Sequence, residues 1–411
     1  MVCVHQRLDS ERLADPRGTA RAATEELLAQ ATTAPGQSVA LTGSSRGIAH
    51  IADIIAGAVE ALRAAGLEPF VVPAMGSHAG GTAESQRAVL HHYGVHPERI
   101  GAPVHSSTDV VEIANTPLGI PIVMDKLAAG ADHILAINRV KAHSHFAGPI
   151  ESGIAKILLI GLGKPAGAKV YHRGFARHGF YAFIECALPV LLRHVSVLGG
   201  LAIVENGLDD TARIEALAAA DILAREPALL LDAHRRMPRL PIDDLDVLIV
   251  DRMGKDISGV GMDPNVIGRD RPGPHIQVIL VRDLTPASEG NAAGIGLADV
   301  TVQRLIDKMD PKATFLNCAT ALHTHLARVP YAFGTDREAL EAALGATAAP
   351  SPDQTRVAWI RDTHALADLE VSEALLADVA ASDHLEATGQ PHDILFHPDG
   401  SLADVFAPHG Q

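Results

Sequence analysis

The segment from Ser38 to Pro73 places the strongest constraint on the fold of this chain. Apolar residues predict a strand at 38–42, a helix at 51–65 and a second strand at 69–73. Two strands joined by a helix pair in parallel, because the helix crosses the sheet with a right-handed connection. The sequence therefore predicts an α/β protein with mainly parallel sheets.

Similar patterns recur on both sides of a proline-containing segment at Met237–Pro241. Further strands are predicted at 133–137, 198–204, 247–250, 276–281 and 357–360. Further helices are predicted at 82–93, 213–235, 298–308, 337–344 and 372–381. A chain of 411 residues is too long for one ordinary core. We therefore expect two α/β domains, residues 1–238 and 239–411, with the active site in the cleft between them.

Composition narrows the class of partner and the compartment. The formal net charge of −15 argues against nucleic acid or an anionic membrane as the main partner. The three cysteines, Cys3, Cys186 and Cys318, are too widely spaced for a disulfide framework or a zinc motif. No signal peptide or transmembrane helix is predicted, so a cytoplasmic protein is expected.

Most candidate functional residues lie between Asn138 and Gly174, directly after the predicted strand at 133–137. The titratable residues of this stretch are His143, His145, Glu151, Lys156, Lys164 and His172. Such groups are costly to bury unless they are paired or used. Reactive residues just past the end of a buried strand are typical of α/β active sites.

Several chemical roles fit these residues. His143 and His145 could share one side of an extended segment and bind zinc together with Glu151 or His172. Lys156 stands alone in an apolar run, which fits either a surface lysine on a helix or a desolvated nucleophile.

Two glycine-rich turns follow the first two predicted strands. Residues 42–49 resemble the cofactor loop of short-chain dehydrogenases, but Ala49 replaces the last glycine and no tyrosine has a lysine four residues later. Arg46 in this turn is suited to an anion. His78, in the sequence GSHAGGT, lies after the second strand and is a catalytic candidate. A third loop, Gly254–Arg269, is rich in glycine and charged side chains and suits an anionic ligand.

Together these motifs resemble the lactate racemase family that uses a nickel pincer nucleotide. The resemblance spans most of the chain and is closest to racemase-domain homologues. It rests on SSRG, GSHAGGT, VKAHSHFAGPIESGIAK, the histidine of YH at 171–172, and GKDISGVGMDPNVIGR. It implies a nickel cofactor, pyridinium-3,5-bisthiocarboxylic acid mononucleotide nickel, attached to a lysine.

The resemblance also implies a role for individual residues. Lys156 matches the tether, and His172, 16 residues later, matches the nickel ligand. His78 matches one catalytic histidine and His143 the other, with His145 as the alternative to His143. Further cofactor contacts are implied for Ser44, Ser45, Arg46 and Glu151. Substrate contacts are expected from Lys255, Asn265, Arg269 and Arg271.

The expected function is racemisation or epimerisation of a 2-hydroxy acid by proton-coupled hydride transfer. Gly43 replaces an aspartate of lactate racemases, and Ile267-Gly268 replaces a tyrosine and glutamine, which points to a 2-hydroxy acid other than lactate. The alternatives are a non-catalytic homologue that binds a nucleotide or anion, and a zinc hydrolase using His143, His145 and His172. The expected partner is a small molecule, with neither nucleic acid nor membrane, and self-association is left open.

Overall fold

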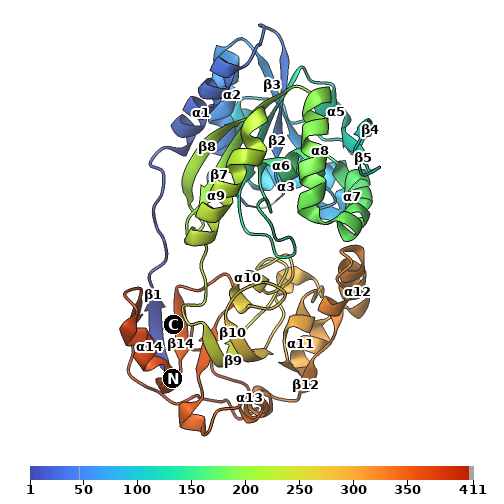
Figure 1. Ribbon diagram of the computed structural model, residues 1–411. Helices are drawn as coiled ribbons and strands as arrows, with labels where there is room; N and C mark the ends of the chain where they lie inside the picture. Colours follow the sequence, from blue (N-terminus) through green and yellow to red (C-terminus); the bar gives the residue numbers. More distant parts are fainter. Residues whose placement is uncertain (46, 407–411) are drawn as a thin grey trace. The chain divides into compact units, whose positions relative to one another are not determined.

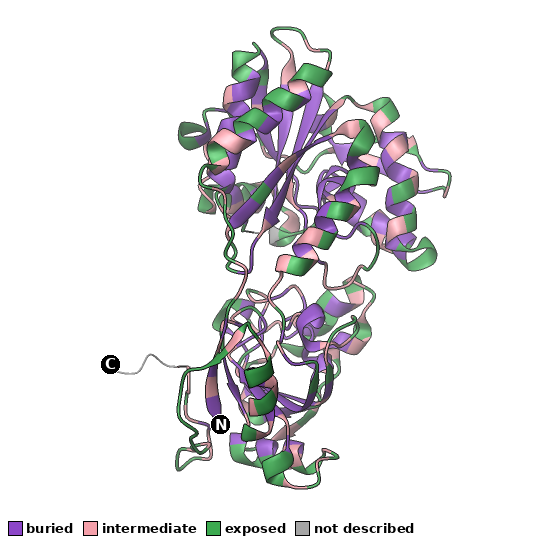
Figure 2. Cartoon of the chain, turned by 60° about the vertical axis from the view of Figure 1, so that its left-hand side comes forward, coloured by how far each residue is buried: buried purple, intermediate pink, exposed green. Residues whose placement is uncertain are grey.

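The computed structural model describes residues 1–45 and 47–406 (Figure 1). The chain forms two compact units. One comprises Asp9–Met237, and the other comprises Met1–Leu8 together with the chain from Pro238 onward. Both units combine a largely parallel sheet with helices, so the α/β class predicted from sequence is confirmed. Figure 2 shows that the strands are buried and that the outer faces of the helices are exposed.

The unit 9–237 is built on a five-stranded sheet in the order β3-β2-β6-β7-β8. The parallel strands are β2 (Ser38–Gly43), β3 (Glu68–Pro73), β6 (His133–Arg139) and β7 (Val197–Glu205), and β8 (Thr211–Ala218) is antiparallel to β7. Alternate side chains of β6 enter two cores. Leu135 and Ile137 pack with α1 (Pro16–Gln30) and α2 (Ile51–Ala64), whereas Ile134 and Ala136 pack on the opposite face.

That opposite face is covered by helices from the second half of the unit. They are α6 (Ile154–Lys156), which continues into a π-helix at Ile157–Gly161, α7 (Lys164–His178), α8 (Phe180–His194) and α9 (Ile222–Arg236). The hairpin of β4 (Val110–Asn115) and β5 (Pro121–Asp125) packs beside α7. The shorter helices are α3 (Ala83–His92), α4 (Pro97–Ile100) and α5 (Lys126–Ala129).

Two predicted helices are wrong at their first turns. The helix predicted at 213–235 begins only at Ile222, because residues 211–218 form β8 and pair with β7. The helix predicted at 298–308 likewise begins as β11 (Val300–Val302) and becomes helical as α11 (Gln303–Lys308). At 211–218 pairing with β7 overrides the local preference of alanine and leucine for helix, whereas Val300, Thr301 and Val302 are β-branched and favour a strand themselves.

The second unit holds an eight-stranded mixed sheet in the order β12-β11-β10-β9-β13-β14-β1-β15. Its parallel strands are β9 (Asp244–Val250), β10 (His275–Val281), β11, β12 (Tyr331–Phe333) and β13 (Val357–Ile360). The antiparallel strands are β14 (Asp368–Val371), β1 (Val2–Gln6) and β15 (Leu385–Ala387). Its helices are α10 (Pro264–Ile267), α11, α12 (Pro311–Thr320), α13 (Asp336–Gly345) and α14 (Leu376–Ala381).

The N-terminal strand belongs to this second sheet. Residues 1–8 were predicted to be part of the first domain, but β1 pairs with β14 on one side and with β15 on the other. Such pairing joins residues more than 360 positions apart, as in the bond between His5 and Asp368. Local sequence patterns carry no information about pairing at that separation.

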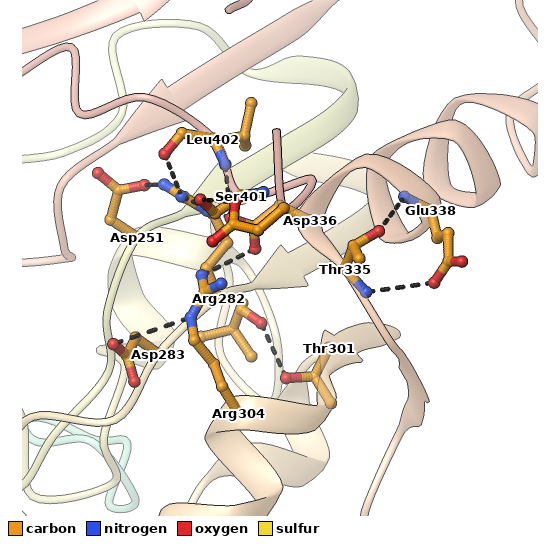
Figure 3. Close-up of polar contacts among 12 residues, drawn as sticks. Asp251, Arg282, Asp283, Thr301, Arg304, Thr335, Asp336, Glu338, Ser401 and Leu402 are labelled. Atoms are coloured by element: carbon orange, nitrogen blue, oxygen red, sulfur yellow. Dashed lines mark hydrogen bonds and ion pairs between the residues drawn. The ribbon is translucent and has the colours of Figure 1, made fainter. Parts of the chain in front are cut away.

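A buried ion-pair network joins the C-terminal segment of the second unit to the rest of that unit (Figure 3). The Arg282 guanidinium lies 2.8 Å from Asp336 Oδ2 and also pairs with Asp251. Asp336 is fully buried and accepts a bond from the backbone N–H of Leu402 (2.8 Å). Because the arginine and its aspartates are paired, their burial is compatible with a stable core. Within the described residues, no helix is long and apolar enough to cross a membrane.

Candidate functional site

The loops that follow β2, β3 and β6 carry most of the site residues predicted in the unit 9–237. These strands are parallel neighbours, so their carboxyl ends lie at one edge of the sheet, where α/β proteins bind ligands. Ser45 follows β2, His78 follows β3 and His143 follows β6. Near this edge the Thr42 hydroxyl bonds both the N–H and the carbonyl of Ile137 (2.8 and 3.0 Å), which ties β2 to β6.

His78 is oriented by a residue from the neighbouring loop. The Oγ of Ser45 lies 2.6 Å from His78 Nδ1. When Nδ1–H donates to Ser45, the neutral imidazole keeps its lone pair on Nε2 and can accept a proton there. The loop is held by Gln86, a fully buried side chain that donates to the Gly76 carbonyl (3.1 Å). Arg46, the predicted anion-binding arginine, lies outside the described residues.

His143 has a different proton arrangement. Its Nδ1 accepts from the backbone N–H groups of His145 (3.0 Å) and Phe146 (3.3 Å). The proton of neutral His143 therefore resides on Nε2, which makes this nitrogen a donor. The backbone N–H of His143 donates to Glu151 Oε2 (2.6 Å), and the Glu151 side chain is buried. Glu151 thus fixes the backbone of the histidine loop.

Phe146 brings His143 and Lys156 together. Its ring stacks on His143, with centroids 4.5 Å apart, and on Phe180, with centroids 4.2 Å apart. The Lys156 ammonium lies 5.8 Å from the centroid of the Phe146 ring, within the range of a cation–π interaction. Sequence patterns gave no reason to select Phe146, because an aromatic residue in a loop has no periodicity.

Phe175 extends this arrangement to His172. The ring of Phe175 lies 5.4 Å from Phe146 and 5.8 Å from His172, both in edge-to-face geometry. His143, Lys156 and His172 therefore surround one aromatic cluster, defined here as Phe146, Phe175 and Phe180. Three separate segments supply these polar residues, and the cluster holds them around one apolar surface.

The short helix that carries Lys156 is capped by Glu226 of α9. Glu226 is fully buried, and its Oε2 accepts from the backbone N–H of Ala155 (3.0 Å). Burial raises the pKa of Glu226 to about 7, against the opposing effect of the helical N–H groups. Gly153 allows this approach, since a Cβ there would lie 2.1 Å from Glu226 Oε1. No sequence pattern marked Glu226, because it is a single carboxylate in a helix distant from the motifs.

A buried ion pair fixes the start of α7. Lys164 Nζ lies 2.9 Å from Asp125 Oδ2 and donates to the Pro73 carbonyl at the end of β3 (2.5 Å). Both side chains are 0% exposed. Burial lowers the pKa of Lys164, and the charge of Asp125 opposes that effect. Lys164 lies between Lys156 and His172 in the chain. Its pair with Asp125 therefore fixes the start of the helix that carries His172, just after the segment of Lys156.

The described residues contain no group of three or more histidine, cysteine, aspartate or glutamate side chains arranged to hold a metal ion. The zinc site considered for His143, His145 and His172 is thus not assembled in this part of the chain. His143 and His145 have ring centroids 6.1 Å apart, and the backbone of His145 donates to His143.

The predicted loop of the second unit begins at a change of direction in the sheet. The chain passes from β9 to β10 on one side, whereas β13 lies on the other side of β9, and such switch points form crevices in α/β sheets. Arg252, just after β9, pairs with Asp362, just after β13 (2.9 Å). Lys255 follows, with its Nζ 2.9 Å from Asn317 Oδ1.

The other predicted substrate residues lie farther along the same loop. Arg271 Nε donates to Asn265 Oδ1 (3.0 Å). Arg269 pairs with Asp299 (2.8 Å) and donates to the carbonyl of Ile276, at the start of β10. Because β9 and β10 are parallel, the start of β10 and the end of β9 lie at opposite edges of the sheet. The structure therefore does not bring Arg269 together with Lys255.

The comparisons with known proteins agree with this architecture. The fold and the site define a class of protein with two α/β units and with histidines in the loops that follow two parallel strands of one sheet, β3 and β6, which lie on either side of β2. Residues 28–180 match the family model of the lactate racemase N-terminal domain. This stretch of the chain is thus similar to the N-terminal domain of lactate racemases. This match covers the loops of His78 and His143, as well as Lys156 and His172.

A solved structure supports the fold. The chain is similar to the crystal structure of a protein from Thermotoga maritima, with a TM-score of 0.53 and 15% sequence identity. The similarity covers 81% of this chain and 86% of that one. At this identity it concerns the fold alone. No curated protein matches the sequence.

Proposed function

We propose that this protein racemises or epimerises a 2-hydroxy acid with a nickel pincer nucleotide attached to Lys156. The observation that carries the proposal is the gathering of His143, Lys156 and His172 around one aromatic cluster. The loop of His78 adjoins the same region, since the N–H of Gly76 donates to the carbonyl of Gly161 (3.0 Å), five residues after Lys156.

The residues present fit such a cofactor. Lys156 would hold it covalently, and His172 would supply an imidazole to its nickel, which suits nickel as a ligand. When bound, the cofactor supplies a hydride acceptor. Ser44 Oγ is buried and has no hydrogen-bond partner among the described residues, as expected of a donor reserved for a ligand. A metal held mainly by its cofactor also needs no cluster of protein ligands.

The two histidines would handle the hydroxyl proton of the substrate. His78, with Nδ1 bonded to Ser45, would take that proton on Nε2. Neutral His143 would donate a hydrogen bond from Nε2 to the substrate oxygen, and it would transfer a proton from Nε2 only as the imidazolium, which carries a second proton on Nδ1. For racemisation His143 must also accept a proton in the reverse direction. That step requires its Nδ1 to give up the bonds from the N–H groups of His145 and Phe146.

We also propose that Lys255, Asn265 and Arg271 of the second unit bind the part of the substrate that is distant from the reacting carbon. The fourth predicted substrate residue, Arg269, fits this role less well, because its guanidinium already bonds Asp299 and strand carbonyls. Lys255→Ala is expected to raise KM for the true substrate with little change in kcat. Arg269→Ala is expected to act mainly through stability.

The cofactor assignment is tested by intact mass and nickel content of protein from a host that makes the pincer nucleotide. We expect a covalent adduct of nucleotide size with stoichiometric nickel. Lys156→Ala should lose the adduct, His172→Ala should keep the adduct and lose nickel, and Lys169→Ala, an exposed lysine on α7, should behave as wild type. Unmodified protein containing zinc would favour the hydrolase, and unmodified protein without metal would favour a binding homologue.

A further inference from the structure

A groove outside the site described above is lined by residues of α7 and of the turn that joins β4 to β5. Figure 1 shows these elements in the unit 9–237. Its volume is about 310 Å³, and its apolar lining comes from Leu118, Ile120, Val170 and Gly174. Ligand pockets in proteins span roughly 300–1,000 Å³ and are mostly apolar with a few polar groups. The groove is therefore large enough for a small organic molecule.

Three cations border this apolar floor. Lys169, Arg173 and Arg177 follow one another at intervals of four residues, so they share one face of α7, and all three line the groove. All three are exposed, and none of their side chains makes a hydrogen bond or ion pair within residues 1–45 and 47–406. Several other arginines of this unit are paired with carboxylates, as Arg236 is with Asp9 and Arg99 with Asp53.

This stripe is unusual in a chain with a net charge of −15. Neighbouring carboxylates neutralise most cations of an acidic protein, and such pairs add little stability at the surface. Three unpaired cations beside a concave apolar surface instead concentrate positive potential at one place. A purely solvated basic face would need no apolar floor.

The walls of the groove are held in place. The Tyr171 hydroxyl accepts from the N–H of Val123 (2.9 Å) and donates to its carbonyl (3.0 Å), which fixes α7 against β5. Thr116 Oγ1 accepts from the N–H of Ile120 (3.0 Å) and so shapes the turn. Gly174 permits close packing, since a Cβ there would lie 2.6 Å from Ile120 Cδ1. A preformed groove binds its ligand with a smaller ordering cost.

We propose that this groove binds an amphipathic small-molecule anion. The apolar or aromatic body of the ligand would lie on Ile120 and Val170, and its carboxylate, sulfonate or phosphate group would meet Lys169, Arg173 and Arg177. Arginine is well suited to such anionic groups because its guanidinium donates in a planar fork. The site uses none of the residues assigned to the racemase reaction. A test of this groove is therefore independent of a test of that function.

The test is a fluorescence titration of the full-length protein with 8-anilinonaphthalene-1-sulfonate, an aromatic monoanion. We expect saturable binding that weakens about tenfold or more in Lys169→Ala/Arg173→Ala/Arg177→Ala. The control is Arg193→Ala on α8, an exposed arginine that likewise makes no contact within the described residues. Its affinity should equal that of wild type. The uncharged N-phenyl-1-naphthylamine should bind more weakly and should not distinguish the variants.

Two further measurements keep the result decisive. Val170→Asp places a carboxylate on the floor without removing a cation, and it should weaken binding of the sulfonate probe. Thermal unfolding should show that every variant is folded like wild type. Equal affinity of wild type and the triple variant, or no saturable binding at all, would overturn the proposal. Displacement of the probe by inorganic phosphate at probe-like concentrations would refute the role of the apolar floor.

Discussion

At the scale of single residues, the candidate site depends on polar atoms whose partners are distant in sequence. Glu226 is the clearest case, because one carboxylate oxygen caps the helix of Lys156 and the other is buried with no hydrogen-bond partner in the part of the chain that the structure describes. Uncompensated burial favours the protonated acid, which explains the pKa of about 7. The residue therefore couples proton uptake to the stability of the site.

Glu226→Gln should remove a pH dependence of stability. The folded-state pKa of about 7 exceeds the reference value of 4.5, so the folded protein binds the proton more tightly than the unfolded chain. The stability contributed by Glu226 is then complete below pH 4.5 and is lost as the pH rises to about 7. The loss is on the order of 3 kcal/mol.

This change is measured as the difference in unfolding free energy between wild type and Glu226→Gln from pH 4.5 to 8. The exposed carboxylate Glu185 on α8 provides the control, because Glu185→Gln should leave the wild-type profile unchanged. A difference between wild type and Glu226→Gln that stays constant with pH would contradict the assignment.

At the scale of elements, the start of α7 is fixed by the ion pair of Lys164 and Asp125. Lys164 adopts φ of 57°, an unfavourable conformation for a residue with a side chain, at the first residue of the helix that carries His172. Its contact with the end of β3 and its pairing with Asp125 hold it there. The pair thus joins β3, β5 and α7.

Breaking this pair from one side should be costlier than removing it entirely. Lys164→Met leaves the Asp125 charge buried without its partner, and we expect a loss of about 3–5 kcal/mol in unfolding free energy. Lys164→Met/Asp125→Asn removes both charges and should recover much of that loss, since asparagine can still cap α5. Denaturant titrations of both variants test this expectation. Equal destabilisation by the single and double changes would show that the pair is not coupled.

At the scale of the whole molecule, the first eight residues belong to the sheet formed by the last part of the chain. Strand β1 lies between β14 and β15 rather than at the edge, so its backbone bonds hold both neighbours. Deleting residues 1–8 should therefore expose these strands while leaving the five-stranded sheet intact. Hydrogen exchange should accelerate in 368–371 and 385–387, with β2 and β6 unchanged. Faster exchange throughout the unit 9–237 would contradict this division.

Much of the unit 9–237 could be predicted because its signals are local. The strand at 38–42, the helix at 51–65 and the strand at 69–73 each show a period of apolar residues, and the structure confirms all three within one or two residues. The resemblance of the chain to lactate racemases was also visible, and it is confirmed over residues 28–180. The roles assigned to His78, His143, Lys156 and His172 stay predictions.

By itself, the sequence determined the α/β class and which residues to suspect, because periodicity and motif spacing are properties of neighbouring positions. Only the tertiary structure decided that residues 211–218 form a strand and that β1 joins the second sheet, because pairing partners come from distant positions. It also revealed Phe146 and Glu226 as neighbours of the Lys156 segment. Their importance comes from burial and from contacts in space, which no local pattern records.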